Sequence, residues 1–207
     1  MIIHNIDQQS EAWHEIRCGR VTGTRFKALV AKETTDTYKD LLTTIACEII
    51  TGKSDETYSN YNMEKGIEME PIARIMYEEE TGNQVKTAGF ITRDEDDEFA
   101  EWIGISPDGL IDNGLIEIKC PLMKTHMGYI MWNKLPAEYH YQVQGQLFVT
   151  GLKFCDFISY VEDMKPFIIR VYPEPDLFTI FEQRLRIAIP QVNELINQYH
   201  KYDYLNE

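Results

Sequence analysis

Hydrophobic residues recur at helical spacing in four long segments of the chain. In residues 38–51 the apolar positions lie three or four residues apart, and Gly52 follows where a helix would end. Residues 63–80, residues 137–149 and the last 30 residues show the same period. These segments predict helices, and the prolines inside the second and the last are points where a helix can bend.

Two further parts of the chain have weaker helical patterns. Residues 10–31 predict two short helices separated by a turn around Gly23, with Thr22 and Thr24 as candidate N-terminal caps. The pattern also becomes helical after Pro121. Helices are therefore expected at both ends of the chain and in its middle.

Apolar runs with β-branched and aromatic residues predict strands between these helices. The runs cover residues 85–92, 99–105, 115–119, 154–161 and 167–172, and the acidic sequence DEDDE connects the first two. The triplet Asp112-Asn113-Gly114 is a strong signal for a tight turn before the strand 115–119. Helices around such strands indicate an α/β or α+β protein with a central mixed sheet.

Composition favours one folded domain over residues 1–207. Hydrophobic residues make up 43% of the chain and aromatic residues 12%, which is enough to form a core. The sequence has no apolar run long enough for a membrane span and no leader-like N-terminus. Its four cysteines form no CxxC pair, which argues against zinc ribbons and cysteine-ligated clusters. We expect a cytoplasmic protein with reduced thiols and no membrane contact.

Charge is abundant and unevenly distributed. With 34 acidic and 20 basic residues, the formal net charge is −14, which argues against a general nucleic-acid coat protein. Residues 53–101 carry 14 acidic and 5 basic side chains, whereas residues 13–32 carry five basic side chains and only one acidic. Residues 117–153 contain four lysines and two acidic residues. This distribution predicts a basic path on an otherwise acidic surface.

The most informative chemistry lies around the predicted tight turn. The sequence Ser106-Pro107-Asp108-Gly109 precedes the turn, and Glu117-Ile118-Lys119 follows it. Residues two apart in a strand point to the same face, so Glu117 and Lys119 project together, and the turn brings Asp108 near them. Such oxygen ligands suit Mg²⁺ or Mn²⁺. The same residues also suit a simpler interpretation, in which Glu117 and Lys119 are an exposed ion pair and Asp108 is a turn former.

Asp108 together with Glu117-x-Lys119 resembles the signature of the PD-(D/E)xK nuclease superfamily. More narrowly, the chain resembles the phage lambda exonuclease and YqaJ-type viral recombinase family. The resemblance rests on five motifs in order: W-H-x-x-R-x-G-x-x-T from Trp13, G-x-x-x-E from Gly66, SPDG from Ser106, E-I-K-C-P from Glu117, and Y-H-Y-Q-V-Q-G-Q-L-F-V-T-G from Tyr139. It implies a restriction-endonuclease-like core, with a central mixed sheet flanked by helices.

The resemblance also implies roles for particular residues. Asp108 and Glu117 match the carboxylates that bridge metal ions, and Glu70 matches an additional acidic residue of the metal site. Ile118 would contribute its backbone carbonyl as a ligand, and Lys119 matches the catalytic lysine. Two Mg²⁺ or Mn²⁺ ions per active site are implied. Glu68 is the alternative to Glu70, and the alternative role for Glu70 is that of a solvated helix carboxylate.

A second set of residues matches the family's pocket for the DNA 5′-phosphate. The set is Arg17, Thr24, Ser106 and Gln142. Arginine binds phosphate oxygens in pairs, and hydroxyl and amide groups complete an anion site. Thr24 is equally suited to a helix cap, and Gln142 to a buried structural amide.

The implied activity is that of a Mg²⁺-dependent 5′-to-3′ exonuclease on double-stranded DNA ends, encoded by a phage or prophage. Such an enzyme releases 5′-mononucleotides and leaves 3′ single-stranded overhangs for recombination. The family also implies a ring-shaped homotrimer and a single-strand annealing protein as partners. Two alternatives remain open: a structure-dependent or restriction-type endonuclease of the same superfamily, and a catalytically silent module that binds DNA ends. A nuclease with an iron–sulfur cluster is disfavoured, because the sequence has no group of C-terminal cysteines.

Overall fold

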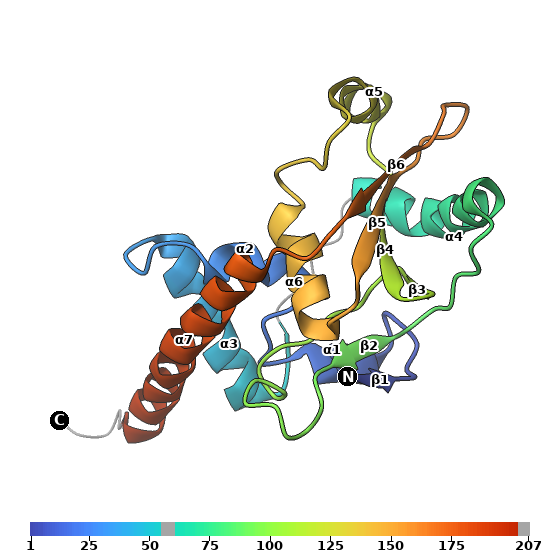
Figure 1. The fold of residues 1–207 in the computed structure, drawn as a ribbon. Helices are drawn as coiled ribbons and strands as arrows, with labels where there is room; N and C mark the ends of the chain where they lie inside the picture. The colour runs from blue at the N-terminus through green and yellow to red at the C-terminus, as the bar shows by residue number, and fades with distance from the viewer. Residues whose placement is uncertain (55–60, 203–207) are drawn as a thin grey trace.

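The computed structural model describes residues 1–54 and 61–202 of the chain (Figure 1). Its elements in order are β1 (Ile2–His4), α1 (Glu11–Arg17), the 3-10 helix η1 (Gly23–Arg25), α2 (Phe26–Leu29), α3 (Asp36–Thr51), α4 (Tyr61–Thr81), β2 (Phe90–Thr92), β3 (Gly109–Ile111), β4 (Gly114–Lys119), α5 (Met123–Trp132), α6 (His140–Thr150), β5 (Phe154–Ser159), β6 (Phe167–Val171) and α7 (Pro175–Lys201). None of these helices is long and apolar enough to cross a lipid bilayer. The mixed α/β class predicted from the pattern is confirmed.

The central sheet has four strands in the order β3-β4-β5-β6. The pairs β3–β4 and β5–β6 are antiparallel, whereas β4 and β5 run parallel, so the sheet is mixed as predicted. The predicted tight turn joins β3 to β4, and Asn113 has the left-handed φ of 58° that such a turn needs. The turn pairs Gly109 with Ile116 and thereby brings the SPDG segment next to β4.

Helices cover both faces of this sheet. On one face, Ile116 and Ile118 of β4 pack with the buried Ala73 and Tyr77 of α4. On the other face, Leu115 packs in a cluster that includes two residues of α6. Figure 1 shows α4 and α6 on opposite sides of the strands. The alternation of side chains along β4 therefore assigns Glu117, two residues from Leu115, to the α6 side.

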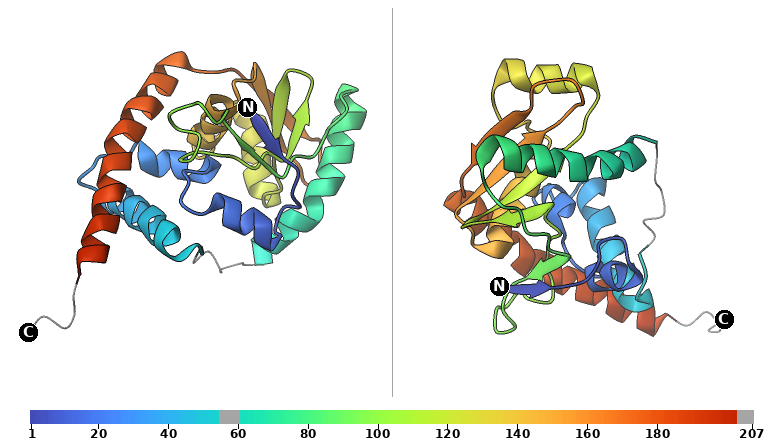
Figure 2. Two further views of the ribbon diagram at one scale, coloured as in Figure 1. Left: turned by 90° about the horizontal axis from the view of Figure 1, so that it is seen from below. Right: turned by 90° about the vertical axis from the view of Figure 1, so that its right-hand side faces the viewer.

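A second apolar core joins helices from the two ends of the chain. Phe26 of α2, Phe148 of α6 and Phe181 of α7 pack together in it, with ring centroids 4.8 to 6.0 Å apart. Figure 2 shows α7 on the side of the molecule opposite α4. A Cβ added to Gly145 of α6 would lie 2.3 Å from the Phe26 ring, so glycine allows α6 to approach α2 closely. This contact places η1 and α2 against the helix that covers the Glu117 side of the sheet.

Some local predictions were wrong. Residues 99–105 form turns and single bridges instead of a strand: Ile103 bridges Val21, and Ile105 bridges Ile91. The segment pairs with two different parts of the chain through a single bridge each, and a single bridge is too short to form a β-ladder. Within residues 85–92 the strand covers only the last three, and its partner β1 was not predicted.

The helix ends are explained by their caps. Glycines in the left-handed conformation stop α3, α4 and α6, at Gly52 as predicted and also at Gly82 and Gly151. The prediction that Thr24 caps a helix is wrong, because this residue lies inside η1, and Thr22 precedes η1 without a side-chain cap bond. Ser10 instead caps α1 by accepting a hydrogen bond from the Trp13 N–H.

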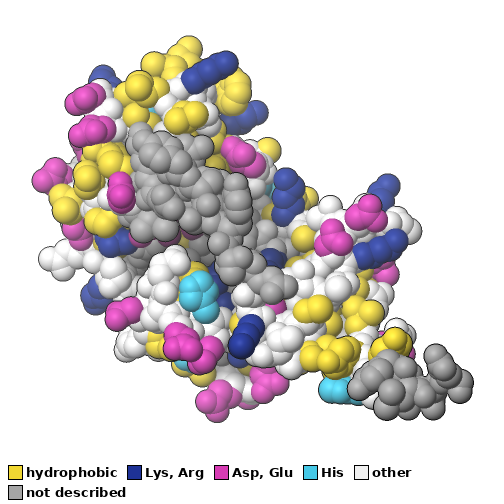
Figure 3. All heavy atoms as spheres, turned by 180° about the vertical axis from the view of Figure 1, so that it is seen from behind, with side chains coloured by type: hydrophobic (Ala, Val, Ile, Leu, Met, Phe, Trp, Pro, Cys, Tyr) yellow, Lys and Arg dark blue, Asp and Glu magenta, His cyan; other side chains and the backbone are white. Residues whose placement is uncertain are grey.

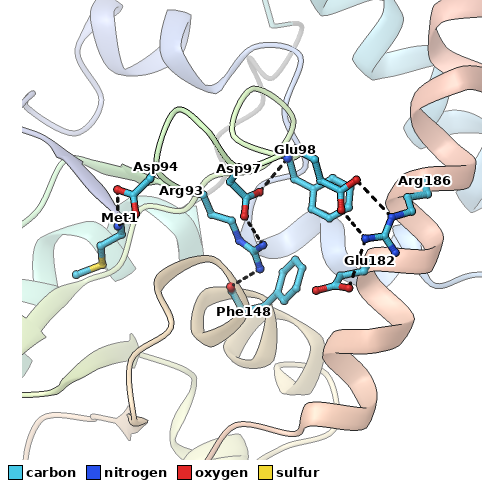
Figure 4. Close-up of polar contacts among 9 residues, drawn as sticks. Met1, Arg93, Asp94, Asp97, Glu98, Phe148, Glu182 and Arg186 are labelled. Carbon is cyan, nitrogen blue, oxygen red and sulfur yellow. Dashed lines mark hydrogen bonds and ion pairs between the residues drawn. The ribbon is translucent and has the colours of Figure 1, made fainter.

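Cations hold the acidic connector between β2 and residues 99–105 against the helices (Figure 4). Arg93 donates to Asp97 and to the Phe148 carbonyl, each at 2.9 Å, and its guanidinium lies 4.0 Å from the Phe148 ring centroid. Arg186 of α7 pairs with Glu98. Part of the negative charge counted in this segment is thus compensated within the fold.

Exposed apolar side chains gather on α5. Met123, Met127, Met131 and Trp132 are between 48% and 73% exposed, and Leu122 precedes them. Figure 3 shows hydrophobic side chains at the end of the molecule that carries this helix, and it shows basic and acidic groups interspersed on the face it presents. The opposite side of α5 is anchored by the buried His126 and Tyr129.

Candidate active site

Glu117 lies at the centre of the site, on the α6 side of β4. Its side chain is only 1% exposed, so the interpretation of Glu117 as part of an exposed ion pair is wrong. The Lys119 ammonium pairs with Glu117 Oε1 and lies 5.4 Å from the centroid of the Tyr139 ring. The two-residue spacing in the strand thus directs both charged groups to one place.

Two amides from α6 orient the Glu117 carboxylate. Gln142 donates to Oε1 at 2.5 Å, and Gln146, one helical turn later, donates to Oε2 at 2.6 Å. Gln144 points away and contacts the Tyr172 carbonyl and the Glu174 N–H, as its position on the helix predicts. The role of Gln146 was missed from the sequence, although its four-residue spacing from Gln142 was the available signal.

Asp108 reaches the same strand from the other arm of the hairpin. Its Oδ2 accepts a hydrogen bond of 2.6 Å from the backbone N–H of Ile118. Because Ile118 lies between Glu117 and Lys119, this bond fixes Asp108 beside both of them. The structure therefore brings these three side chains together at the end of β4.

Glu70 approaches the site from α4. Arg74, one turn later, donates to Glu70 Oε1 at 2.5 Å and to the Asp108 carbonyl at 3.2 Å. The alternative candidate Glu68 is exposed. Glu70 is thus the residue of this pair that α4 directs toward the other carboxylates, whereas Arg74 was not identified from the sequence.

The electrostatics of the site show an excess of buried negative charge. Burial, and then the charge of Glu117, raise the pKa of Asp108 well above its ordinary value. Burial also raises the pKa of Glu70, with a further contribution from Glu117. For Lys119, burial favours a lower pKa, but the charges of Glu117 and Asp108 outweigh it and raise the pKa. The charge of Glu117 thus makes ionisation of Asp108 and of Glu70 more costly.

This donor set fits a divalent cation. Carboxylates and a backbone carbonyl are hard oxygen ligands, and a cation of charge two would relieve the repulsion between Glu70, Asp108 and Glu117. Among the described residues, no three acidic, histidine or cysteine side chains already surround one point as metal ligands do. The oxygens of Glu117 instead face the Lys119 ammonium and the two α6 amides.

Among the four residues matched to a phosphate pocket, Arg17 and Ser106 are in direct contact. Arg17 donates to Ser106 Oγ at 3.3 Å, and its guanidinium lies 4.0 Å from the Trp13 ring centroid. Trp13 also donates to Ser106 Oγ, at 2.8 Å. Gln142 lies with Glu117, whereas Thr24 is exposed on η1.

The segment that carries Thr24 is held close to α6. A Cβ added to Gly23 would lie 3.4 Å from Gln142 Cγ and 3.8 Å from Gln146 Cγ, so η1 lies close to these two side chains. The nearby Arg25 binds both oxygens of the buried Glu48, at 2.5 and 2.7 Å. The basic count for residues 13–32 therefore overstates the charge that this segment offers to a phosphate.

A mixed sheet between helices, with two carboxylates and a lysine at one strand end, defines a protein with the restriction-endonuclease-like nuclease fold. Residues 12–153 match the model of the YqaJ-like viral recombinase domain. The chain belongs to this family. No curated protein matches it.

Solved structures agree with this assignment. Two crystal structures of LHK-Exo, an alkaline exonuclease from Laribacter hongkongensis, are 32% identical to this chain with a TM-score of 0.81. The matches cover 92% and 93% of this chain and 96% and 97% of LHK-Exo, and one of the two structures is a complex with dAMP. A phage-related exonuclease from Haemophilus somnus 129PT, 17% identical with a TM-score of 0.68 over 87% of this chain and 96% of its own, shares the fold.

Proposed function

We propose that residues 1–207 form one Mg²⁺-dependent exonuclease domain that degrades one strand of linear double-stranded DNA in the 5′-to-3′ direction. It would release 5′-mononucleotides and leave 3′ single-stranded overhangs for recombination. The observation that carries the proposal is the convergence of Asp108, Glu117 and Lys119 at the end of β4, with Glu70 directed toward them from α4. The likeness to an alkaline exonuclease supports the activity, and its complex with dAMP supports a mononucleotide product.

In this proposal, Glu70, Asp108, Glu117 and the Ile118 carbonyl would hold two Mg²⁺ ions, or Mn²⁺ in their place. When bound, such ions generate a nucleophilic hydroxide and stabilise charge on a phosphodiester. Lys119 places a positive charge beside the reacting phosphate, which favours the more negative transition state. Gln142 and Gln146 hold the Glu117 carboxylate in one orientation, so that it is preorganised for its ligand.

The direction of digestion would come from a pocket for the terminal 5′-phosphate. Arg17 and Ser106 already lie in contact, and stacking on Trp13 holds the guanidinium plane in place. Thr24 and Gln142 would complete the anion site from η1 and α6. Ser106 is two residues from Asp108, so a 5′-phosphate bound there lies near the carboxylates and permits removal of one nucleotide per step.

The proposed partners follow from the same assignment. The chain would act in the cytoplasm of a bacterial host, as a homotrimeric ring and beside a single-strand annealing protein. The exposed apolar side chains of α5 support a contact with another protein chain, because such groups gain by leaving water. Light scattering of the purified protein tests the trimer: a mass of three chains supports it, and a stable monomer contradicts it.

The decisive assay compares linear and closed circular duplexes of the same sequence. With Mg²⁺, the protein should release mononucleotides from the 5′ end of 5′-phosphorylated linear DNA and leave the circle intact. EDTA, or the Lys119→Ala substitution, should stop the release. Cutting of the circle would instead establish an endonuclease, and end binding without metal-dependent turnover would establish a silent binding module. Wild-type digestion by the Lys119→Ala protein would refute the assignment of the site.

A further inference from the structure

One arginine joins two parts of the candidate site that are distant in sequence. Through Nη2, Arg74 binds the Glu70 carboxylate, and through Nε it binds the backbone carbonyl of Asp108. Glu70 lies on the same helix, whereas Asp108 lies 34 residues further along the chain. Both bonds come from one planar guanidinium, so the positions of the two acceptors depend on each other.

The location of Arg74 differs from that of an ordinary surface ion pair. It follows the fully buried Ala73, and its own side chain is 21% exposed. It lines a cleft of about 410 Å³ together with Glu70, Asp108 and residues 6–9. An exposed pair four residues apart on a helix contributes little by itself. Here the second bond connects the helix to the loop that carries Asp108.

We propose that Arg74 is a positioning residue that aligns Glu70 with the Asp108 loop for binding of the divalent metal. The inference rests on the proposed function, because it assumes that these carboxylates hold metal. Arg74 occupies Oε1 of Glu70 and fixes the direction of the carboxylate. Without Arg74, Glu70 would turn freely about its side-chain bonds, and α4 would lose its polar connection to the Asp108 carbonyl.

The test compares Arg74→Ala and Arg74→Lys with Arg186→Ala. The last substitution removes the same side chain from an exposed ion pair on α7, remote in the fold from β4. Binding of Mn²⁺ to the DNA-free protein is measured from the electron paramagnetic resonance signal of free Mn²⁺. The Mg²⁺ concentration for half-maximal digestion and the thermal unfolding temperature are measured on the same samples.

We expect Arg74→Ala to weaken Mn²⁺ binding about 10-fold or more and to raise the half-maximal Mg²⁺ concentration similarly. The Mn²⁺ affinity of Arg74→Lys should lie between those of the wild type and Arg74→Ala, because one ammonium cannot bind both acceptors in the same geometry. Arg186→Ala should bind Mn²⁺ as the wild type does. If the Arg74→Ala protein does not fold, Mn²⁺ binding by the Arg74→Lys protein decides the test.

Unchanged Mn²⁺ binding in a folded Arg74 variant would overturn the inference, even if digestion is slower, since Arg74 would then act on DNA and not on the metal site. That result leaves the proposed function intact when the wild type still digests DNA with Mg²⁺. A wild-type protein without metal-dependent digestion contradicts the proposed function itself, and Mn²⁺ binding then reports on Arg74 alone.

Discussion

Glu48 and Asp108 are two carboxylates inside the same protein with opposite surroundings. Glu48 accepts two hydrogen bonds from Arg25 and a third from the Gly19 N–H at 2.9 Å. Burial alone favours a higher pKa for Glu48, but the Arg25 bonds and charge, with the Gly19 N–H, lower it below the ordinary value. Asp108 has a raised pKa, because burial and the charge of Glu117 act in the same direction.

A third carboxylate, Asp156, is also held by an arginine. Arg170 binds both of its oxygens, at 2.7 and 2.8 Å, and the Tyr77 hydroxyl donates to it at 2.6 Å. Glu48 and Asp156 are thus each paired with an arginine, whereas Asp108 and Glu117 lie together at the end of β4 beside Lys119. The difference supports the proposed role of Asp108 and Glu117 in binding a cation, because unmatched buried charge lowers stability.

The largest expected effect comes from removing the unmatched charge. Asp108→Asn keeps the shape of the side chain and should reduce nucleotide release from linear duplex DNA by about 10³-fold, since the proposed metal site loses an anionic ligand. The thermal unfolding temperature without metal should stay the same or rise, because repulsion with Glu117 disappears. Substantial residual activity would show that Asp108 is as structural as Glu48.

Removing Glu48, the carboxylate that Arg25 binds, should instead lower the stability of the fold. Glu48→Ala leaves Arg25 buried without its partner and should lower the free energy of unfolding by about 3–5 kcal/mol, measured by urea denaturation. Glu33→Ala is the control, because Glu33 pairs with Arg184 at the surface and contributes about 1 kcal/mol or less. Wild-type stability of the Glu48→Ala protein would remove the basis for the comparison.

The glutamines of α6 offer a matched set within one helix. Gln142→Ala and Gln146→Ala should each lower digestion about 10- to 100-fold, because Glu117 loses an amide that orients it. Gln144→Ala removes contacts with the Tyr172 carbonyl and the Glu174 N–H, so it should affect stability while activity per folded molecule is retained. Equal losses of activity in all three variants would mean that the amides act only through the packing of α6.

The smallest expected effect is a difference between Asp108→Asn and Glu48→Gln in how folding stability depends on pH. Stability is measured by urea denaturation in EDTA. The pKa of Asp108 is higher in the folded protein than its ordinary value of 3.8, so the protonated side chain stabilises the folded state below pH 3.8. This stabilisation is lost as the pH rises through the pKa of the folded protein. The advantage of Asp108→Asn over the wild type should therefore grow from pH 4 to pH 8. Glu48 has a lowered pKa, so the deficit of Glu48→Gln should shrink as the pH falls below 4.5. Parallel pH profiles for the two variants would contradict the assigned surroundings.

Local spacing predicted a large part of the fold. The helical period located α3, α4, α6 and α7, and glycines marked three of their ends, because left-handed backbone at a helix end is a local property. The turn at Asn113 brought β3 against β4 for the same reason. Residues 99–105 were mistaken for a strand, because apolar alternation does not reveal whether a long enough partner exists.

By itself, the sequence determined the direction of side chains within each element and therefore the pairing of Glu117 with Lys119 at one strand end. The tertiary structure alone decided which groups surround them. Gln146 meets Glu117, Arg74 meets the Asp108 carbonyl, and Arg25 is withdrawn from the basic segment by Glu48. Each of these contacts spans more than 20 residues of chain, and such contacts depend on how whole helices pack against the sheet, which no local spacing specifies.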